Sequence, residues 1–259
     1  MNLTAIAARS GYMFTLLLAM GCDASNPTQP RAPQPTFATT KRLDVRRCAP
    51  GPGFTVVSTN PWFPLDVGRQ LVLEGEEEGE TLTNVVTVLN VTRTIQGVVT
   101  RVVEEREFLN GELSEVTWNY HVQAPDGSIC YYGEDVDVYT DAGITHEGAW
   151  CPGGDNQPGI FMPADPKPGM EYQNEVAPGI ALDEARIVGA GPTTVPFGRF
   201  EETIRIREFD PLTGDKDHKV HARGVGIIVD GPLELIDVRQ TSGTPLLPTI
   251  TDPQCGTEG

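Results

Sequence analysis

Apolar and polar residues alternate along most of the chain, and turn-forming residues interrupt the alternation at short intervals. The clearest such stretch is 97–151, where β-branched and aromatic residues alternate with charged ones. Three turn sequences divide it, each of a type that tolerates the positive φ of tight hairpins: Asn110-Gly111, Asp126-Gly127 and Asp141-Ala142-Gly143. The pattern predicts a four-stranded antiparallel meander with strands at 98–109, 112–124, 128–140 and 144–151.

The remainder of the chain shows no 3.6-residue period of the kind that an amphipathic helix produces. It is rich in turn formers, with 28 glycines and 22 prolines in total. Residues 48–255 are enough to bury a sizeable core as one β domain. We therefore predict an all-β fold, an antiparallel β-sandwich or partial barrel.

The chain resembles itself at a fixed displacement. Gly68 falls on Gly169 when the sequence is moved by 101 residues, and Arg106-Glu107-Phe108 then falls on Arg207-Glu208-Phe209. One shared period of this length indicates a duplicated supersecondary unit. Because neither copy has helices to cover its sheet, we expect two meander halves, about 60–160 and 161–240, to cover each other. The alternative is a coincidence between two β-rich stretches.

The N-terminus has the features of an export signal. Residues 12–20 (YMFTLLLAM) form an apolar run that is too short to span a bilayer, so 1–21 is predicted to be a signal peptide. Cys22 follows directly and resembles the lipidated cysteine of a bacterial lipobox, although an ordinary signal peptide with a chance cysteine is the alternative. Residues 22–47 then form a Pro-rich tether to a membrane, and 256–259 a short tail.

The charge balance narrows the range of partners. The chain has 36 acidic and 19 basic residues, a net charge of −17 at pH 7. Such a surface repels phosphate backbones, which argues against nucleic-acid binding. An acidic surface also favours solubility outside the cell. We expect a cell-envelope protein, attached by lipid to the outer membrane or the cell surface.

Four cysteines remain when Cys22 is set aside: Cys48, Cys130, Cys151 and Cys255. Three pairings are possible. If Tyr139 faces Ile144 across the last hairpin turn, Cys151 lies opposite Tyr132 and beside Cys130. This favours a Cys130–Cys151 bridge and leaves Cys48 to pair with Cys255. A zinc site is the rival interpretation, but no C-x2-C pair is present.

Several short sequence motifs occur together in the region that is predicted to fold. They are NPWFPLDVG at 60–68, EGAW at 147–150, PGIFMP at 158–163, VPFGRF at 195–200 and ARGVG at 222–226. The set resembles a family of uncharacterised exported bacterial β-rich proteins, often lipoproteins, with an N-P-x-F-P-L-x-x-G opening. The resemblance implies an envelope location and a β architecture, and it carries over no catalytic residue.

The best polar candidate for a site is the Pro/Gly-rich segment 155–184 between the two copies. It combines aromatic or apolar side chains with carboxylates, which is typical of a loop-closed ligand pocket. The alternative is that the apolar residues plug the end of the sandwich and the acids are solvated. The pocket candidates are Trp150, Phe161, Met162, Glu171, Tyr172, Glu175, Asp183 and Glu184.

A second acidic group offers weak metal candidates. Asp135 and Asp137 share one strand face and carry the oxygen ligands that Ca²⁺ prefers. Acids that alternate on a solvent-facing strand are the alternative. No other cofactor is indicated.

The familiar catalytic motifs G-x-S-x-G, H-E-x-x-H and G-x-x-x-x-G-K are absent from the sequence, as is an EF-hand loop. Our leading hypothesis is a non-catalytic envelope lipoprotein that binds a small or lipidic ligand between its sheets or a partner at its surface. The alternatives are a secreted hydrolase that uses paired carboxylates from 155–184, and a Ca²⁺-stabilised adhesion or matrix component.

Overall fold

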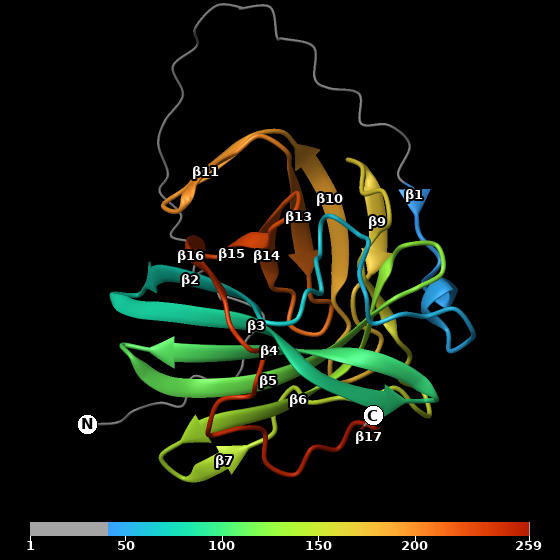
Figure 1. Ribbon diagram of the computed structural model, residues 1–259, viewed down its shortest axis with the longest axis horizontal. Coiled ribbons are helices and arrows are strands. Elements are labelled where there is room, and N and C mark those ends of the chain that lie inside the picture. The colour runs from blue at the N-terminus through green and yellow to red at the C-terminus, as the bar shows by residue number, and fades with distance from the viewer. Residues whose placement is uncertain (1–40, 259) are drawn as a thin grey trace, which may run out of the picture.

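The computed structural model describes residues 41–258, and within them it contains strands and one 3₁₀ helix. Figure 1 shows the arrangement. The all-β prediction is confirmed. The elements are β1 (Lys41–Arg42), η1 (Val45–Cys48), β2 (Arg69–Glu77), β3 (Glu80–Ile95), β4 (Val98–Leu109), β5 (Glu112–Gln123), β6 (Ile129–Thr140), β7 (Gly143–Thr145), β8 (Gly159–Met162), β9 (Met170–Gln173), β10 (Glu184–Ala190), β11 (Thr193–Val195), β12 (Gly198–Phe200), β13 (Thr203–Phe209), β14 (Lys216–Ala222), β15 (Gly226–Asp230), β16 (Leu233–Gln240) and β17 (Thr257–Glu258).

One sheet contains nearly all of these strands. Its order is β1-β9-β10-β13-β14-β15-β16-β2-β3-β4-β5-β6-β7, with β17 paired to β3 and β8 paired to β6. The pairing of β16 with β2 joins the two halves, and β1 and β7 are the open ends. The sheet folds over itself, so that β9, β10 and β13 pack across β3–β6 (Figure 1). The result is a sandwich whose two layers are continuous in one sheet.

The predicted meander is present, but its fourth strand is much shorter than expected. Asn110 and Gly111 both have positive φ at the β4–β5 turn, 52° and 83°, as the Asn-Gly dipeptide predicts. Tyr139 pairs with Ile144, also as predicted. β7 nevertheless ends at Thr145, and the edge of β6 is covered instead by β8.

The strand order of the first half recurs in the second. The run β2-β3-β4-β5-β6 corresponds to β9-β10-β13-β14-β15. Register agrees at the centre: Val86 pairs with Glu105, and Ile187, at the predicted displacement, pairs with Ile206. The copies differ most where the long β3–β4 hairpin is replaced by the separate hairpin β11–β12. The two halves are therefore related in order and, in part, in register.

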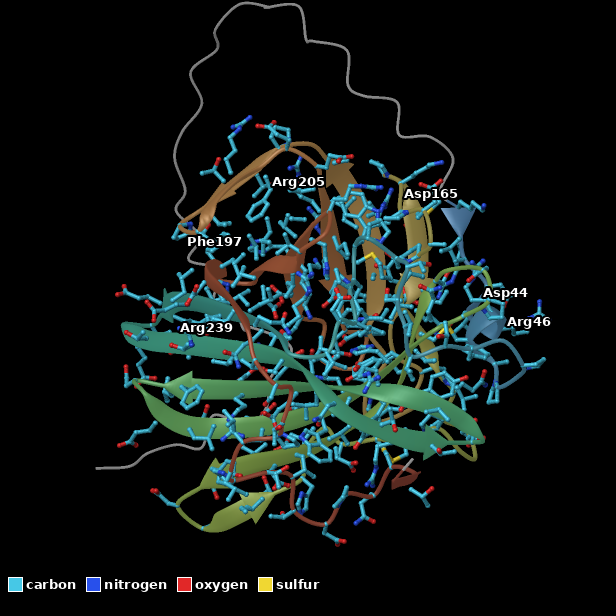
Figure 2. The ribbon with its side chains drawn as sticks, viewed as in Figure 1. Asp44, Arg46, Asp165, Phe197, Arg205 and Arg239 are labelled. Atoms are coloured by element: carbon cyan, nitrogen blue, oxygen red, sulfur yellow. A yellow bond between two sulfur atoms is a disulfide. The ribbon has the colours of Figure 1, made fainter. Side chains whose placement is uncertain are left out.

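Two clusters of buried apolar residues pack the layers of the sandwich together. The larger includes Val103, Ile187 and Ile206, which join the halves. The smaller packs β2 against β14–β16 beneath the β11–β12 hairpin, where Phe197 (labelled in Figure 2) stacks against Phe200. Each buried aliphatic side chain contributes about 1.5–3 kcal/mol. Hydrophobic burial therefore fixes the two halves against each other.

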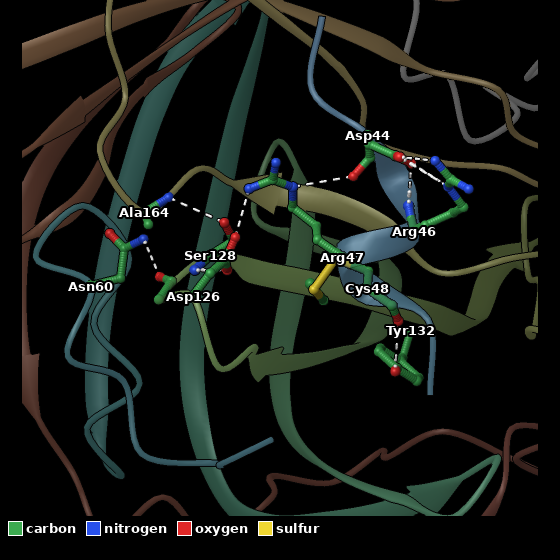
Figure 3. Close-up of a disulfide and its surroundings, with 11 residues drawn as sticks. Asp44, Arg46, Arg47, Cys48, Asn60, Asp126, Ser128, Tyr132 and Ala164 are labelled. Atoms are coloured by element: carbon green, nitrogen blue, oxygen red, sulfur yellow. Dashed lines mark hydrogen bonds and ion pairs between the residues drawn. A yellow bond between two sulfur atoms is a disulfide. The ribbon is translucent and has the colours of Figure 1, made fainter. Parts of the chain in front are cut away.

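The disulfide pairing differs from the prediction. Cys48 is bonded to Cys130, and Cys151 to Cys255 (Figure 3 shows the first). Strand pairing resumes after β7 with Trp150 opposite Glu134, so Cys151 lies beside Gly133 rather than opposite Tyr132. That slip of one position directs the two cysteines to different partners. The bridges indicate an oxidising location outside the cytoplasm.

The domain extends slightly beyond its predicted limits of 48–255. Lys41 and Arg42, assigned to the tether, pair with β9, and Thr257, assigned to the tail, pairs with β3. The signal peptide, Cys22 and the tether as far as residue 40 lie outside the described residues. Within 41–258 the structure contains no helix that is long and apolar enough to cross a bilayer.

The NPWFPLDVG phrase has a structural role. The Asn60 side-chain amide donates to the carbonyls of Gly127 and Pro163, both at 3.0 Å, and its Oδ1 accepts from the Trp62 amide (Figure 3 shows the Asn60–Gly127 region). Gly68 has φ 83°, and a Cβ there would lie 2.0 Å from the Thr241 carbonyl oxygen. These residues tie the start of the domain to the β5–β6 turn and to the C-terminal segment.

Candidate functional site

The inner faces of the two halves carry acidic side chains that point toward each other. In the first half Glu107 pairs with Glu115, Glu105 with Thr117 and Glu134 with Asn119. Directly opposed residues in antiparallel strands lie on the same face. The acids from β4, β5 and β6 therefore form one acidic surface.

The second half presents a matching surface. Glu208 pairs with Asp217 on β13 and β14, and Asp230 pairs with Lys219. Glu175 and Asp183 join them from the connection between β9 and β10. We call the following residues the carboxylate cluster: Glu105, Glu107, Glu115, Glu134, Glu175, Asp183, Glu208, Asp217 and Asp230.

Lys219 is the cation that this cluster contains. Its Nζ lies 3.1 Å from Glu208 Oε2 and 3.6 Å from Asp230 Oδ1. The side chains of Lys219, Glu208 and Asp230 keep 19%, 12% and 21% of their surface exposed, so solvent reaches this part of the interior. Lys219 also has a raised pKa: burial opposes its charge, but the surrounding carboxylates outweigh that cost.

Most of the cluster has no such partner. Within residues 41–258, no lysine, arginine or histidine nitrogen lies within ion-pair distance of these carboxylates: Glu105, Glu107, Glu115, Glu134, Glu175 and Asp183. Glu175 is buried, Glu107 is exposed and the other four are half-buried. Acids removed from solvent normally have a cation or several hydrogen-bond donors beside them. If all of them were ionised, the inner faces would carry more negative charge than the cations of the described residues neutralise.

The pKa values of the cluster reflect this excess charge. Burial, together with Glu115 and Glu105, raises the pKa of Glu134 to about 8, against a hydrogen bond from Tyr131 that lowers it. Burial also raises the pKa of Glu208 to about 7, although Lys219 lowers it. The pKa of Glu175 lies well above its ordinary value because of burial and the charges of Glu134 and Asp183. These groups hold protons near neutral pH that an exposed carboxyl would have lost.

Polar groups beside the cluster also lack partners. The Asn84 amide donates to Glu105 Oε2 at 2.9 Å and that of Asn174 donates to Glu208 Oε1 at 3.3 Å. In both residues the amide oxygen is buried and has no hydrogen-bond partner among the described residues. The buried hydroxyl of Tyr172, whose pKa is raised by burial and by Glu208, is unpartnered in the same sense. Each unmet group of this kind costs about 1–3 kcal/mol.

Only some of the residues that were predicted to form the pocket lie at the carboxylate cluster; others lie on the outer side of β9 and β10. Glu175, Asp183 and Tyr172 lie in or beside the cluster. Glu171 and Glu184 instead lie on the outer side, in ion pairs with Arg186 at 3.3 Å and Arg42 at 2.7 Å. These two acids turn away because they alternate with the inward-facing positions of β9 and β10.

The predicted aromatic lining packs against other aromatic residues. The ring of Trp150 lies 5.6 Å from that of Tyr131, and the ring of Phe161 lies 4.6 Å from that of Phe63. Met162 is fully buried in the main core. Trp150 and Met162 are therefore buried, and Phe161 is partly buried, among apolar and aromatic neighbours.

Asp135 and Asp137 face the opposite side of β6 and hold the C-terminal segment. Asp135 Oδ1 accepts from the backbone amide of Gln254 at 2.8 Å, and Asp137 Oδ2 accepts from that of Thr251 at 2.8 Å. Asp135 does lie close to Cys151 and Cys255, but those sulfurs are bonded to each other and offer no thiolate. Their arrangement corresponds to a structural role rather than to a Ca²⁺ site.

The cluster members outside 155–184 were not predicted from the sequence to be pocket residues. One signal was present: β4 contains Glu104, Glu105 and Glu107, so it carries acids on both of its faces. A strand inside a sandwich with charge on both faces indicates a polar interior. The internal displacement was a second signal, because it superimposes Glu107 on Glu208, and both belong to the cluster.

Comparison with known proteins adds no identification: no protein-family model, curated protein or solved structure matches the chain. The geometry and chemistry of the carboxylate cluster are therefore the basis on which a function can be assigned.

Proposed function

We propose that the protein is a non-catalytic, lipid-anchored binding protein of the bacterial cell envelope, and that it holds a small polar ligand in the carboxylate cluster. The observation that carries the proposal is the set of carboxylates without an ion-pair partner, and of buried amide oxygens without a hydrogen-bond partner, between the halves of the described chain. The anchor follows from the sequence around Cys22, and the two disulfides support an exported protein.

The chemistry of the interior favours a polar ligand over a lipidic one. An acyl chain between the halves would have to displace water from partly exposed carboxylates such as Glu208 and Glu134 without replacing its hydrogen bonds. The aromatic side chains that would line an apolar cavity, Trp150 and Phe161, contact other rings instead.

The binding proposal is tested by a thermal-shift screen of small polar compounds against the purified protein. We expect at least one class of compound to raise the melting temperature, since a ligand that binds only the folded state stabilises it. Replacing Glu175→Gln should abolish that shift, and the exposed Glu147→Gln should retain it as a control for the change in charge. Failure of every class would overturn the proposal.

The anchor is tested separately by Cys22→Ala. Mass spectrometry of the mature N-terminus should show an acylated cysteine in the wild type, and the variant should leave the membrane fraction. An unmodified N-terminus in the wild type would refute the lipid anchor and leave the ligand site unaffected.

One observation favours a second function, carboxylate-dependent hydrolysis. Glu175 holds its proton beside Asp183, to which it is hydrogen-bonded, and such a pair can divide the roles of general acid and base. Hydrolysis of chromogenic glycosides or esters that is lost in both Glu175→Gln and Asp183→Asn, and kept in Glu147→Gln, would support this function. Absence of turnover in the wild type would eliminate it.

A further inference from the structure

The carboxylate cluster also indicates which class of ligand would occupy it. The inference rests on the proposed binding function and concerns the same site. Three independent features bear on it: the sign of the unbalanced charge, the spacing of the carboxylates, and the hydrogen-bonding type of the unpartnered atoms.

The sign of the charge requires a cation. Lys219 is the only lysine or arginine of the described residues that forms ion pairs within the cluster, and it is already shared by Glu208 and Asp230. Glu105, Glu115 and Glu134 lie on the opposite layer, where none of them has a cation at ion-pair distance among the described residues. An anionic ligand would add to the charge repulsion, whereas a cationic ligand would remove it.

The spacing argues against a single metal ion. In residues 41–258 the only three potential ligand atoms that converge within 4.8 Å are those of Asp135, Cys151 and Cys255, on the other face of β6. The carboxylates of the cluster are spread along both inner faces and do not converge in this way. Ca²⁺ requires six to eight oxygens at about 2.3–2.6 Å, so a charge distributed along a ligand fits this spacing better than a point charge.

The unpartnered atoms require a donor. Asn84 and Asn174 each give their amide N–H to a glutamate, which fixes the orientation of the amide and leaves its oxygen as a buried acceptor. An ammonium group has three N–H donors and no acceptor, so it can satisfy a carboxylate and an amide oxygen together. The Lys219 ammonium already lies between two of these carboxylates, Glu208 and Asp230.

We infer that the ligand is an organic cation with two or more ammonium groups along a flexible chain, a linear polyamine, held between the carboxylates of β4–β6 and those of the β9–β10 connection. One end of the ligand lies near Asn84 and Glu105, and the other near Glu175 and Asp183. Glu208, Asp217 and Asp230 remain with Lys219.

The test is calorimetric titration of the purified protein with spermidine at pH 8.5 and low salt. We expect a single saturable event. Glu105→Gln and Glu175→Gln should each weaken it about tenfold or more, because a bound ammonium favours the ionised form of each carboxyl and a glutamine cannot ionise to make that charge-assisted contact. Glu147→Gln removes the same charge from an exposed loop and should leave the affinity unchanged. Melting curves establish that each variant is folded.

Two further arms separate the explanations. Lys219→Met vacates the place of the built-in ammonium, and we expect it to raise the affinity for spermidine several-fold. Ca²⁺ is titrated in parallel, and we expect it to bind more weakly than spermidine and to be insensitive to Asn84→Leu. Spermidine affinity that is equal in the site variants and in Glu147→Gln would show attraction to the general surface charge and would overturn the inference.

Tighter binding of Ca²⁺ that depends on the same residues would also overturn it, in favour of a metal. If spermidine fails but another compound from the screen binds in a Glu175-dependent manner, the polyamine is wrong and the binding function stands. If neither spermidine nor any screened compound binds, both are wrong.

Discussion

The two faces of the first half-sheet both bury charged residues, and they differ in how those residues are satisfied. On the outer face, Asp135 accepts hydrogen bonds from Tyr120, Gln254 and Cys255, and Arg106 donates to the carbonyl of Pro248 at 2.8 Å. On the inner face, Glu105 and Glu134 lack a cation. The outer groups thus fasten the C-terminal segment to the sheet, whereas the inner groups are left with capacity for another molecule.

The largest expected loss of stability comes from breaking the disulfide that holds the C-terminal segment against the outer face. The double substitution Cys151→Ser with Cys255→Ser removes a bridge that closes a sequence separation of 104 residues. On the chain-entropy model this lowers the free energy of unfolding by about 4–5 kcal/mol. Urea denaturation measures the loss. A loss below about 1 kcal/mol would show that the segment is held without the bridge.

Removing the hydrogen bonds of the outer face should lower the free energy of unfolding by less than removing the disulfide does. Asp135→Ala leaves two backbone amides and the Tyr120 hydroxyl without their acceptor, and we expect a loss of about 3 kcal/mol. Asp135→Asn keeps one acceptor oxygen and should lose about half as much. Equal stability of Asp135→Ala and the wild type in urea would contradict the assigned role.

Removing a carboxylate from the inner face should instead raise the free energy of unfolding at high pH. The folded-state pKa of Glu134 is raised to about 8, whereas the unfolded value is about 4.3. The folded protein therefore binds more protons than the unfolded chain between these values, and its stability falls as the pH rises from about 5 to 9. Glu134→Gln should be more stable than the wild type by about 1–2 kcal/mol at pH 9, and equal to it at pH 5.

This difference is measured by melting temperatures across that pH range. A variant that is less stable than the wild type at pH 9 would show that the inner carboxylate is satisfied in the same way as the outer ones.

The smallest effect is expected at the predicted site residue that turned outward. Glu171 forms a partly exposed ion pair with Arg186, and such pairs contribute about 0–1 kcal/mol. Glu171→Gln should change the free energy of unfolding by less than about 0.5 kcal/mol and should not affect spermidine binding. Loss of binding in this variant would extend the site to the outer face.

The sequence predicted the fold better than it predicted the site, for physical reasons. Hairpin signals such as Asn110-Gly111 are local, so the meander could be derived from neighbouring residues. The disulfides could not, because the pairing of Cys151 depends on a one-residue slip opposite Gly133 and on the path of a distant C-terminal segment. Long-range register is fixed by packing, which alternation along one strand does not report.

The site was predictable only in part for a related reason. Glu175 and Asp183 were identified because they lie in one loop, but their partners Glu105, Glu134 and Glu208 come from three strands. On each strand the acidic positions resembled a solvent-facing stripe. Only the folding of the sheet over itself turns two such stripes into facing inner surfaces.

The central claim is that most inner carboxylates have no ion-pair partner among the described residues and are available to a cationic ligand. Carbon-13 NMR titration of the glutamate side-chain carboxyls tests it most directly. The account predicts that Glu134 titrates near pH 8 and Glu208, which Lys219 already contacts, near pH 7, and that added spermidine lowers the pKa of Glu134 more than that of Glu208. Titration of both carboxyls near pH 4, with no response to spermidine, would contradict it.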